Sequence, residues 1–305
     1  MTDDQTAGVH GHLWAIVPKP SVDTLILVPT IAPDRLPDRL VALEAVHNFR
    51  DLGGYTTIDG RVTRWQTLYR ADGLHRLTTA DVEALRALGL HTVVDLRTDR
   101  ELDERGTFPV DAYPVTFHHL PVIDVTWDPN TGDESDPAEF LFHQYESLLA
   151  YGEPLFAKAF HLLGLPGALP AVFHCAAGKD RTGILAALIL SALGVPHDVV
   201  TEDYGLSRSA MVRMRKWATA HSPELAAAWD NAPSSHLAAE PEAMARLLAA
   251  LTERHGSVRS YLISLGVSNA LLIHLESSLL VDRGHHPLDG RRIARDGHAP
   301  RRYRT

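Results

Sequence analysis

The single cysteine of the chain stands where a nucleophile and an anion site would coincide. Five residues separate Cys175 from Arg181 in the stretch HCAAGKDRTG. The apolar run LPAVFH precedes the thiol, and the apolar run TGILAALILSALGV follows the arginine, which predicts a strand, a loop and then a helix. Such a loop aims backbone N–H groups and the positive end of a helix at an anion.

The spacing gives each residue of the loop a chemical role. The small residues that let the backbone approach a ligand closely are Ala176, Ala177 and Gly178. The planar guanidinium of Arg181 suits two oxygens of one phosphate. The same positive field stabilises a thiolate on Cys175, which would attack phosphorus and form a phosphocysteine that water then hydrolyses.

Three more polar residues complete the candidate site. Thr182 can hydrogen-bond the sulfur as it leaves in the second step. Lys179 adds a second cation, and Lys is rare here because it occurs elsewhere only at Lys19, Lys158 and Lys216. Its two interpretations are a contact to a second phosphate or to an acidic head group, which we favour, and a solvent-facing side chain. Asp180 either donates a proton or orients Arg181 or a backbone amide.

A buried structural thiol is the alternative interpretation of Cys175. A Walker-type phosphate loop does not fit, because Asp180 follows Lys179 where Ser or Thr is required. A sulfurtransferase loop would have a different spacing between the cysteine and the arginine. His174, the glycine and the Thr-Gly after the arginine together make HCxxxxxR typical of cysteine-dependent phosphatases.

The stretches HCAAGKDRTG, NFRDLGGY and VVDLRTDRE resemble the bacterial tyrosine phosphatases of the PtpB and LipA type. Similarity also extends to EDYGLS at 202–207 and GSVRSYLISLGVSNA at 256–270. The resemblance implies a phosphatase fold that acts on phosphotyrosine, in some members on phosphoserine, phosphothreonine or phosphoinositides, without a metal or other cofactor.

Cleavage of a phosphate ester needs a proton for the leaving oxygen. Asp95 ends a predicted strand in the motif DLR, Asp124 ends the next one, and Asp180 lies in the loop itself. We favour Asp95 as the acid, with a structural ion pair to Arg97 or Arg50 as its alternative. Asp124 has the alternative of a solvated turn residue.

Composition limits the class of protein. With 45% hydrophobic residues the chain can bury a sizeable core, and a net charge of −9 gives no global reason to bind nucleic acid or an anionic membrane. One cysteine cannot form an internal disulfide, and no signal peptide or membrane span is apparent. These features favour the cytoplasm. The histidines show no metal-binding spacing, so we predict no metal.

Strands and helices alternate along most of the chain. HTVVDL, VTFHHLPVID and LPAVFH are predicted strands. The stretch LTTADVEALRALGL is a predicted helix, with Thr78 as N-cap, Asp81 in a capping box and Gly89 at its end. A long helix from 140 to 164 is expected to break at Pro154. This order predicts an α/β fold with a mostly parallel central sheet flanked by helices.

Three segments are predicted. Residues 1–45 form a β-rich N-terminal extension, 46–281 form the catalytic domain with a largely helical C-terminal part, and 282–305 form a flexible basic tail. The predicted reaction is hydrolysis of phosphate monoesters on a phosphorylated protein. The alternatives are a phosphoinositide phosphatase with the same mechanism, and a phosphate-binding module without turnover.

Overall fold

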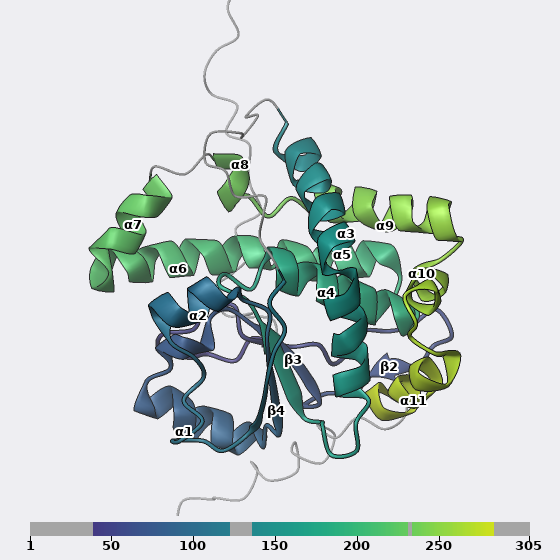
Figure 1. Ribbon diagram of the computed structural model, residues 1–305, viewed down its shortest axis with the longest axis horizontal. Coiled ribbons are helices and arrows are strands. Elements are labelled where there is room, and N and C mark those ends of the chain that lie inside the picture. Colours follow the sequence, from purple (N-terminus) through teal and green to yellow (C-terminus); the bar gives the residue numbers. More distant parts are fainter. Residues whose placement is uncertain (1–38, 123–135, 231–233, 284–305) are drawn as a thin grey trace, which may run out of the picture. The chain divides into compact units, whose positions relative to one another are not determined.

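The computed structural model describes residues 39–122, 136–230 and 234–283 (Figure 1). A five-stranded sheet is its centre, with the strands in the order β1-β3-β6-β4-β5. Only β1 is antiparallel to its neighbour, and β3, β6, β4 and β5 run parallel. The strands are β1 (Arg50–Asp51), β3 (Leu68–Ala71), β4 (Thr92–Asp95), β5 (Thr116–His119) and β6 (Ala171–His174). The predicted α/β class with a mostly parallel sheet is confirmed.

A second, two-stranded sheet pairs β2 (Val62–Thr63) with β7 (Leu280–Val281) in antiparallel fashion. The remaining elements are helical. They are η1 (Leu74–Arg76), α1 (Thr79–Leu88), α2 (Asp99–Arg105), α3 (Pro137–Leu163), α4 (Asp180–Ala192), α5 (His197–Gly205), α6 (Ser207–His221), α7 (Pro223–Asp230), α8 (Ser234–Leu237), α9 (Pro241–His255), α10 (Val258–Ser264) and α11 (Asn269–Leu279).

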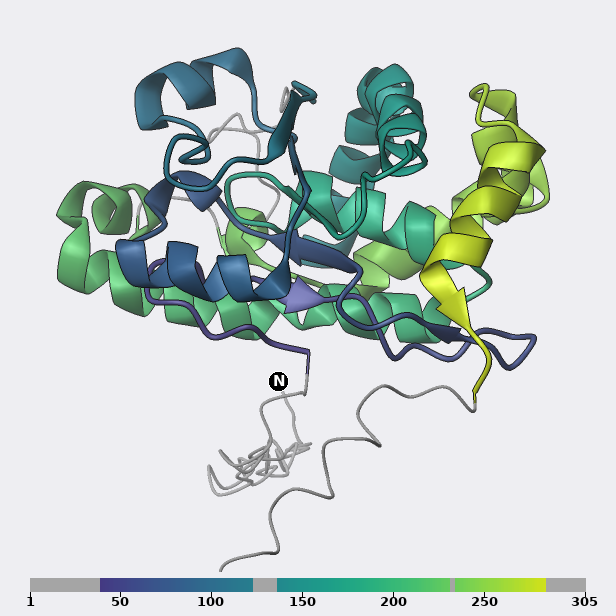
Figure 2. The ribbon, with the colours of Figure 1, turned by 90° about the horizontal axis from the view of Figure 1, so that it is seen from below.

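Helices cover both faces of the sheet, as parallel sheets require. Alternate residues of β6 show the two sides: Val172 belongs to the core beneath α1, whereas Ala171 and Phe173 belong to the larger core under α3, α4 and α9. Figures 1 and 2 both show α1 and α2 on one side of the strands, with α3 and α4 on the other. The carboxyl ends of β3, β4 and β6 therefore meet between two helical layers.

The local rules of helix formation hold at α1. Thr78 caps the helix, Asp81 completes the capping box, and Gly89 ends the helix in the left-handed conformation, as its sequence predicts. The predicted break at Pro154 is wrong, because α3 continues through it. Proline removes the hydrogen bond to the carbonyl of Ala150, and both residues are exposed, so water can bind that carbonyl.

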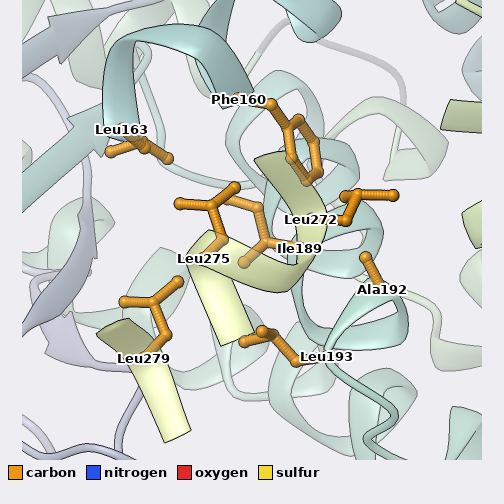
Figure 3. A pocket seen from close by; sticks show the side chains of 8 residues that line it. All are labelled: Phe160, Leu163, Ile189, Ala192, Leu193, Leu272, Leu275 and Leu279. Carbon is orange, nitrogen blue, oxygen red and sulfur yellow. The ribbon is translucent and has the colours of Figure 1, made fainter. Parts of the chain in front are cut away.

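A small apolar cavity of about 10 Å³ lies between α3, α4 and α11 (Figure 3). Its lining consists of Phe160, Leu163, Ile189, Ala192, Leu193, Leu272, Leu275 and Leu279. A water molecule needs at least this volume and also polar partners, which these side chains do not offer. We therefore regard the cavity as a packing gap of the core.

Some predictions fall on residues that the structure does not describe. Asp124 lies outside the described residues, as do residues 1–38 of the predicted extension and 284–305 of the predicted tail. Among the helices that are described, none combines the length and the apolar character needed to cross a membrane.

Candidate active site

The cysteine loop connects the central strand of the sheet to a buried helix. β6 ends at His174, Cys175 follows, and α4 begins at Asp180. Cys175 is a free thiol with 2% of its surface exposed. The strand-loop-helix order that the spacing predicts is present, so the thiol lies at the N-terminal end of α4, where the helix dipole favours negative charge.

The carbonyl groups of the loop are bound from outside. The Ala176 carbonyl accepts from the Gly73 amide (3.0 Å), and the Asn48 side-chain amide donates to the Ala177 and Gly178 carbonyls (3.0 Å each). In a trans peptide the N–H group points opposite to the C=O group. The amides that follow these carbonyls therefore point toward the inside of the loop, where an anion would lie.

Gly178 is required by two features of this loop. Its φ of 65° is in the left-handed region, and a Cβ added there would lie 2.5 Å from the Ala71 carbonyl oxygen. Its own carbonyl also accepts a hydrogen bond from Nη2 of buried Arg70, at 2.8 Å. The loop thus packs directly against the end of β3, and no larger residue fits.

Arg181 is held in place by Glu101 of α2. The guanidinium donates to both carboxylate oxygens, with Nη1–Oε2 of 2.6 Å and Nη2–Oε1 of 2.9 Å. Burial would raise the pKa of Glu101, but the hydrogen bonds and charge of Arg181 outweigh it and bring the pKa to about 2. Glu101 is therefore ionised at neutral pH and fixes the plane of the arginine.

The same glutamate completes the N-terminal cap of α2. Its Oε2 accepts a hydrogen bond from the Thr98 amide (2.8 Å), and the Thr98 hydroxyl accepts one from the Glu101 amide (3.3 Å). The start of α2 and the position of Arg181 are thus linked through one carboxylate. Sequence reasoning missed this residue, although the T-x-x-E pattern of a capping box was visible.

Asp95 lies at the end of β4 in a buried ion pair. Arg97 donates to it through Nε (3.0 Å) and Nη2 (2.6 Å), and neither side chain is exposed. Burial would raise the pKa of Asp95, but the hydrogen bonds and the charge of Arg97 outweigh it and lower the pKa below its usual value. Asp95 therefore forms the structural ion pair with Arg97 that is the alternative to its role as general acid, and its carboxylate faces Arg97 and His174.

His174 is fully buried beside the same carboxylate. Its Nε2 lies 3.5 Å from Oδ2 of Asp95, and its Nδ1 lies 3.3 Å from the carbonyl oxygen of Cys175. Burial lowers the pKa of His174, so the ring is neutral at physiological pH. Asp95, Arg97 and His174 together support the strand end that presents Cys175.

Asp180 and Lys179 point to protein partners in the structure. Oδ1 of Asp180 accepts a hydrogen bond from the Tyr145 hydroxyl (2.6 Å), and Lys179 Nζ lies 3.3 Å from the same oxygen. Lys179 Nζ also donates to the Ala238 carbonyl (2.7 Å) between α8 and α9, and the lysine is fully buried. The solvent-facing interpretation of Lys179 does not match this position.

Thr182 is the last of the predicted site residues. It is fully buried in the first turn of α4, and its hydroxyl has no hydrogen-bond partner among the described residues. A buried hydroxyl without a partner costs free energy, which a ligand or a thiolate acceptor would recover. The position fits the role of donor to sulfur that its place after Arg181 suggests.

The segment NFRDLGGY packs against the outer side of the loop, where the loop carbonyls are bound. Asn48 binds the loop carbonyls, and Arg50 forms an ion pair with buried Asp203 (3.0 Å), to which Arg70 also binds (2.6 Å). Asp203 belongs to the motif EDYGLS. The segments NFRDLGGY and EDYGLS, which both carry the resemblance, therefore meet behind the loop. Their charged residues Arg50 and Asp203 form a buried ion pair that stabilises the fold there.

The comparisons with known proteins agree with this site. A sequence model of the tyrosine phosphatase family matches residues 41–281, and the chain belongs to this family. It is 28% identical over 277 residues to the triple specificity protein phosphatase PtpB of Mycobacterium tuberculosis, covering 78% of this chain and 98% of that protein. A tyrosine-protein phosphatase of Nostoc commune is 29% identical over 225 residues, covering 69% of this chain and 73% of its own length.

Among solved structures, the core catalytic domain of the PP-IP phosphatase SIW14 from S. cerevisiae matches with a TM-score of 0.33 and 16% identity. That match covers 54% of this chain and 78% of the other. The membership of the family and the named relatives make this protein a phosphatase, as its sequence predicts.

Proposed function

We propose that the chain hydrolyses phosphate monoesters, phosphotyrosine among them, through a phosphocysteine on Cys175. The observation that carries this proposal is the outward bonding of the loop carbonyls around the thiol. The inward amides of residues 177–179, with Arg181, would bind the phosphate oxygens and stabilise charge on the transferring group. Thr182 would donate to the sulfur.

The reaction has two balanced steps. The Cys175 thiolate attacks phosphorus, the S–P bond forms, the bond to the leaving oxygen breaks, and that oxygen takes a proton from a general acid. Water then attacks the phosphocysteine, gives a proton to the same residue, and the thiolate leaves. Phosphate and the alcohol or phenol are the products.

We propose Asp180 as this acid, because it belongs to the loop and its Oδ2 forms no hydrogen bond with the described residues. Asp95 is bound by Arg97 and faces His174, which supports a positioning role for it. Lys179 binds the Ala238 carbonyl, which supports a role in anchoring the α8–α9 segment. Residues 176–178 would act through their backbone.

The cysteine substitution tests the mechanism. Cys175→Ser should fold, bind phosphate analogues and lose turnover of a chromogenic aryl phosphate, with vanadate inhibiting the wild type and EDTA leaving it unchanged. Turnover by Cys175→Ser at the wild-type rate would overturn the mechanism. Binding of phosphopeptide by the wild type without turnover would instead support a phosphate-binding module.

The substrate class extends the proposal. The name of the PtpB relative, a triple specificity phosphatase, supports substrates beyond phosphotyrosine, and phosphoinositides are the alternative substrate. Rates on a phosphotyrosyl, a phosphoseryl and a phosphoinositide substrate would rank them. A catalytic thiolate must stay reduced, so we propose a cytoplasmic location.

A further inference from the structure

Two buried tyrosines stand behind the first residue of α4. Tyr145 of α3 donates to Oδ1 of Asp180 at 2.6 Å, and its hydroxyl lies 2.5 Å from the hydroxyl of Tyr204 of α5. Both tyrosines are 1% exposed, and their rings meet edge to face with centroids 6.0 Å apart. Helices α3 and α5 thus each contribute one tyrosine to a hydrogen-bond chain that ends on the carboxylate of α4.

Both hydroxyls remain protonated at physiological pH. Burial, followed by the negative charge of Asp180, raises the pKa of Tyr145 and Tyr204 well above the usual value. Because Tyr145 gives its one proton to Asp180, the hydrogen bond between the tyrosines is donated by Tyr204. The two hydrogen bonds are therefore donated in one direction, from Tyr204 to Tyr145 and from Tyr145 to Oδ1 of Asp180.

Lys179 makes this direction the favoured one. In the reverse arrangement a proton on Oδ1 would be donated to the Tyr145 hydroxyl, and that proton would lie near the ammonium group, 3.3 Å from Oδ1. An oxygen that faces both a hydroxyl group and an ammonium group, which has only protons to donate, acts as a hydrogen-bond acceptor. The tyrosine hydrogen bond and the ammonium charge both keep Oδ1 as the acceptor.

We infer that Tyr145, supported by Tyr204, is a positioning residue that makes Oδ2 of Asp180 the oxygen that carries the catalytic proton. A carboxyl group has one proton and two oxygens, and a proton on the bound Oδ1 is useless to the leaving group. The tyrosine pair fixes the rotation of the carboxylate and leaves Oδ2 for proton transfer in both steps. This inference rests on the proposed role of Asp180 as general acid.

The leaving group of the substrate separates this role from a merely structural one. A phenolate that is already a weak base leaves without a proton, whereas an ordinary phenolate needs the acid. The rate constant kcat/KM reports the steps up to cleavage of the P–O bond. The test is therefore a comparison of kcat/KM for 2,4-dinitrophenyl phosphate, whose leaving group does not need the acid, with kcat/KM for phenyl phosphate, whose leaving group does.

The experiment uses the full chain with Tyr145→Phe, Asp180→Asn and a matched control, Tyr261→Phe. Tyr261 also donates to a carboxylate, that of Glu153 (3.1 Å), but belongs to α10. Asp180→Asn should reduce kcat/KM for phenyl phosphate about 100-fold more than kcat/KM for 2,4-dinitrophenyl phosphate. Tyr145→Phe should reduce kcat/KM for phenyl phosphate about tenfold more than kcat/KM for the dinitrophenyl ester, as for loss of a hydrogen bond to a charged group.

Each outcome decides one point. Equal losses on both substrates, or no loss, for Tyr145→Phe would overturn the positioning role while Asp180 stays the acid. A loss in Asp180→Asn that does not depend on the leaving group would remove Asp180 as the acid and the inference with it. A leaving-group effect in Tyr261→Phe as large as that in Tyr145→Phe would also overturn the inference.

Discussion

Glu101 and Arg181 form a two-point ion pair between the start of α2 and the start of α4, with N–O distances of 2.6 and 2.9 Å. The pair joins residues 80 positions apart, and its glutamate also belongs to the capping box of α2. A planar guanidinium bound at two points has one orientation. The geometry of the phosphate site therefore depends on a helix that contributes no residue to the loop.

Replacing Glu101 by glutamine should break this two-point contact. The carboxamide NH₂ group faces a guanidinium that has no acceptor, so one of the two hydrogen bonds is lost together with the charge. We expect kcat/KM for an aryl phosphate to fall about 100-fold, since small displacements of a catalytic group have effects of this size. Steady-state kinetics with the purified variant measures it.

The matched control is Glu104→Gln on the same helix. Glu104 pairs with exposed Arg100, so its loss should leave kcat/KM close to that of the wild type. A Glu101→Gln variant with wild-type kcat/KM would show that Arg181 keeps its position without the glutamate.

The same ion pair predicts how stability depends on pH. The pKa of Glu101 is about 2 in the folded chain and about 4.3 when a glutamate is exposed, as in the unfolded chain. A carboxyl group whose pKa is lower in the folded chain stabilises the fold at any pH above its pKa in the unfolded chain. This contribution is lost as the pH falls through its pKa in the folded chain. The stability difference between wild type and Glu101→Gln should therefore narrow from pH 5 downward.

Urea unfolding of both proteins at pH 7, 5 and 3 gives this difference directly. It should be equal at pH 7 and pH 5 and smaller at pH 3. A difference that grows toward acid pH would mean that the neutral glutamic acid holds Arg181 better than the carboxylate does, against the direction of the pKa.

Local patterns in the sequence are sufficient for much of the fold. The Thr78–Asp81 capping box and the strand and helix on either side of Cys175 depend on residues within a few positions of one another, and the structure has all of them. Pro154 was misjudged because the consequence of a missing N–H depends on whether the freed carbonyl is exposed, which a local pattern does not contain.

The supports of the site could not be predicted for a related reason. Glu101 and Tyr145 reach the loop from 80 and 35 positions away, so no spacing rule relates them to it. Asp95 and Arg97 are only two positions apart, and their ion pair was accordingly one of the two interpretations. Choosing between these two required the burial of both side chains, which follows from tertiary packing.

Asp95→Asn separates support from catalysis. Removing the carboxylate leaves the buried charge of Arg97 without its ion-pair partner, so we expect a loss of about 3 kcal/mol in the free energy of unfolding. The ratio of kcat/KM for 2,4-dinitrophenyl phosphate to that for phenyl phosphate should stay at its wild-type value. Denaturant unfolding and kinetics on the same preparation measure the two quantities. A selective loss on phenyl phosphate would restore Asp95 as the general acid.

Gly178→Ala tests whether the shape of the loop depends on the contact with β3. The added Cβ would lie 2.5 Å from the Ala71 carbonyl oxygen. The loop must therefore move, and its N–H groups would no longer point at one anion position. Gly256→Ala is the matched control, because Gly256 has a φ of 82° and nothing within 4 Å of its added Cβ. The left-handed backbone should cost each variant about 1 kcal/mol of stability. Gly178→Ala should lose more than this because of the contact with Ala71, and only Gly178→Ala should lose phosphate binding and turnover. Equal kinetics in the two variants would mean that the loop tolerates a side chain where the structure leaves no room for one.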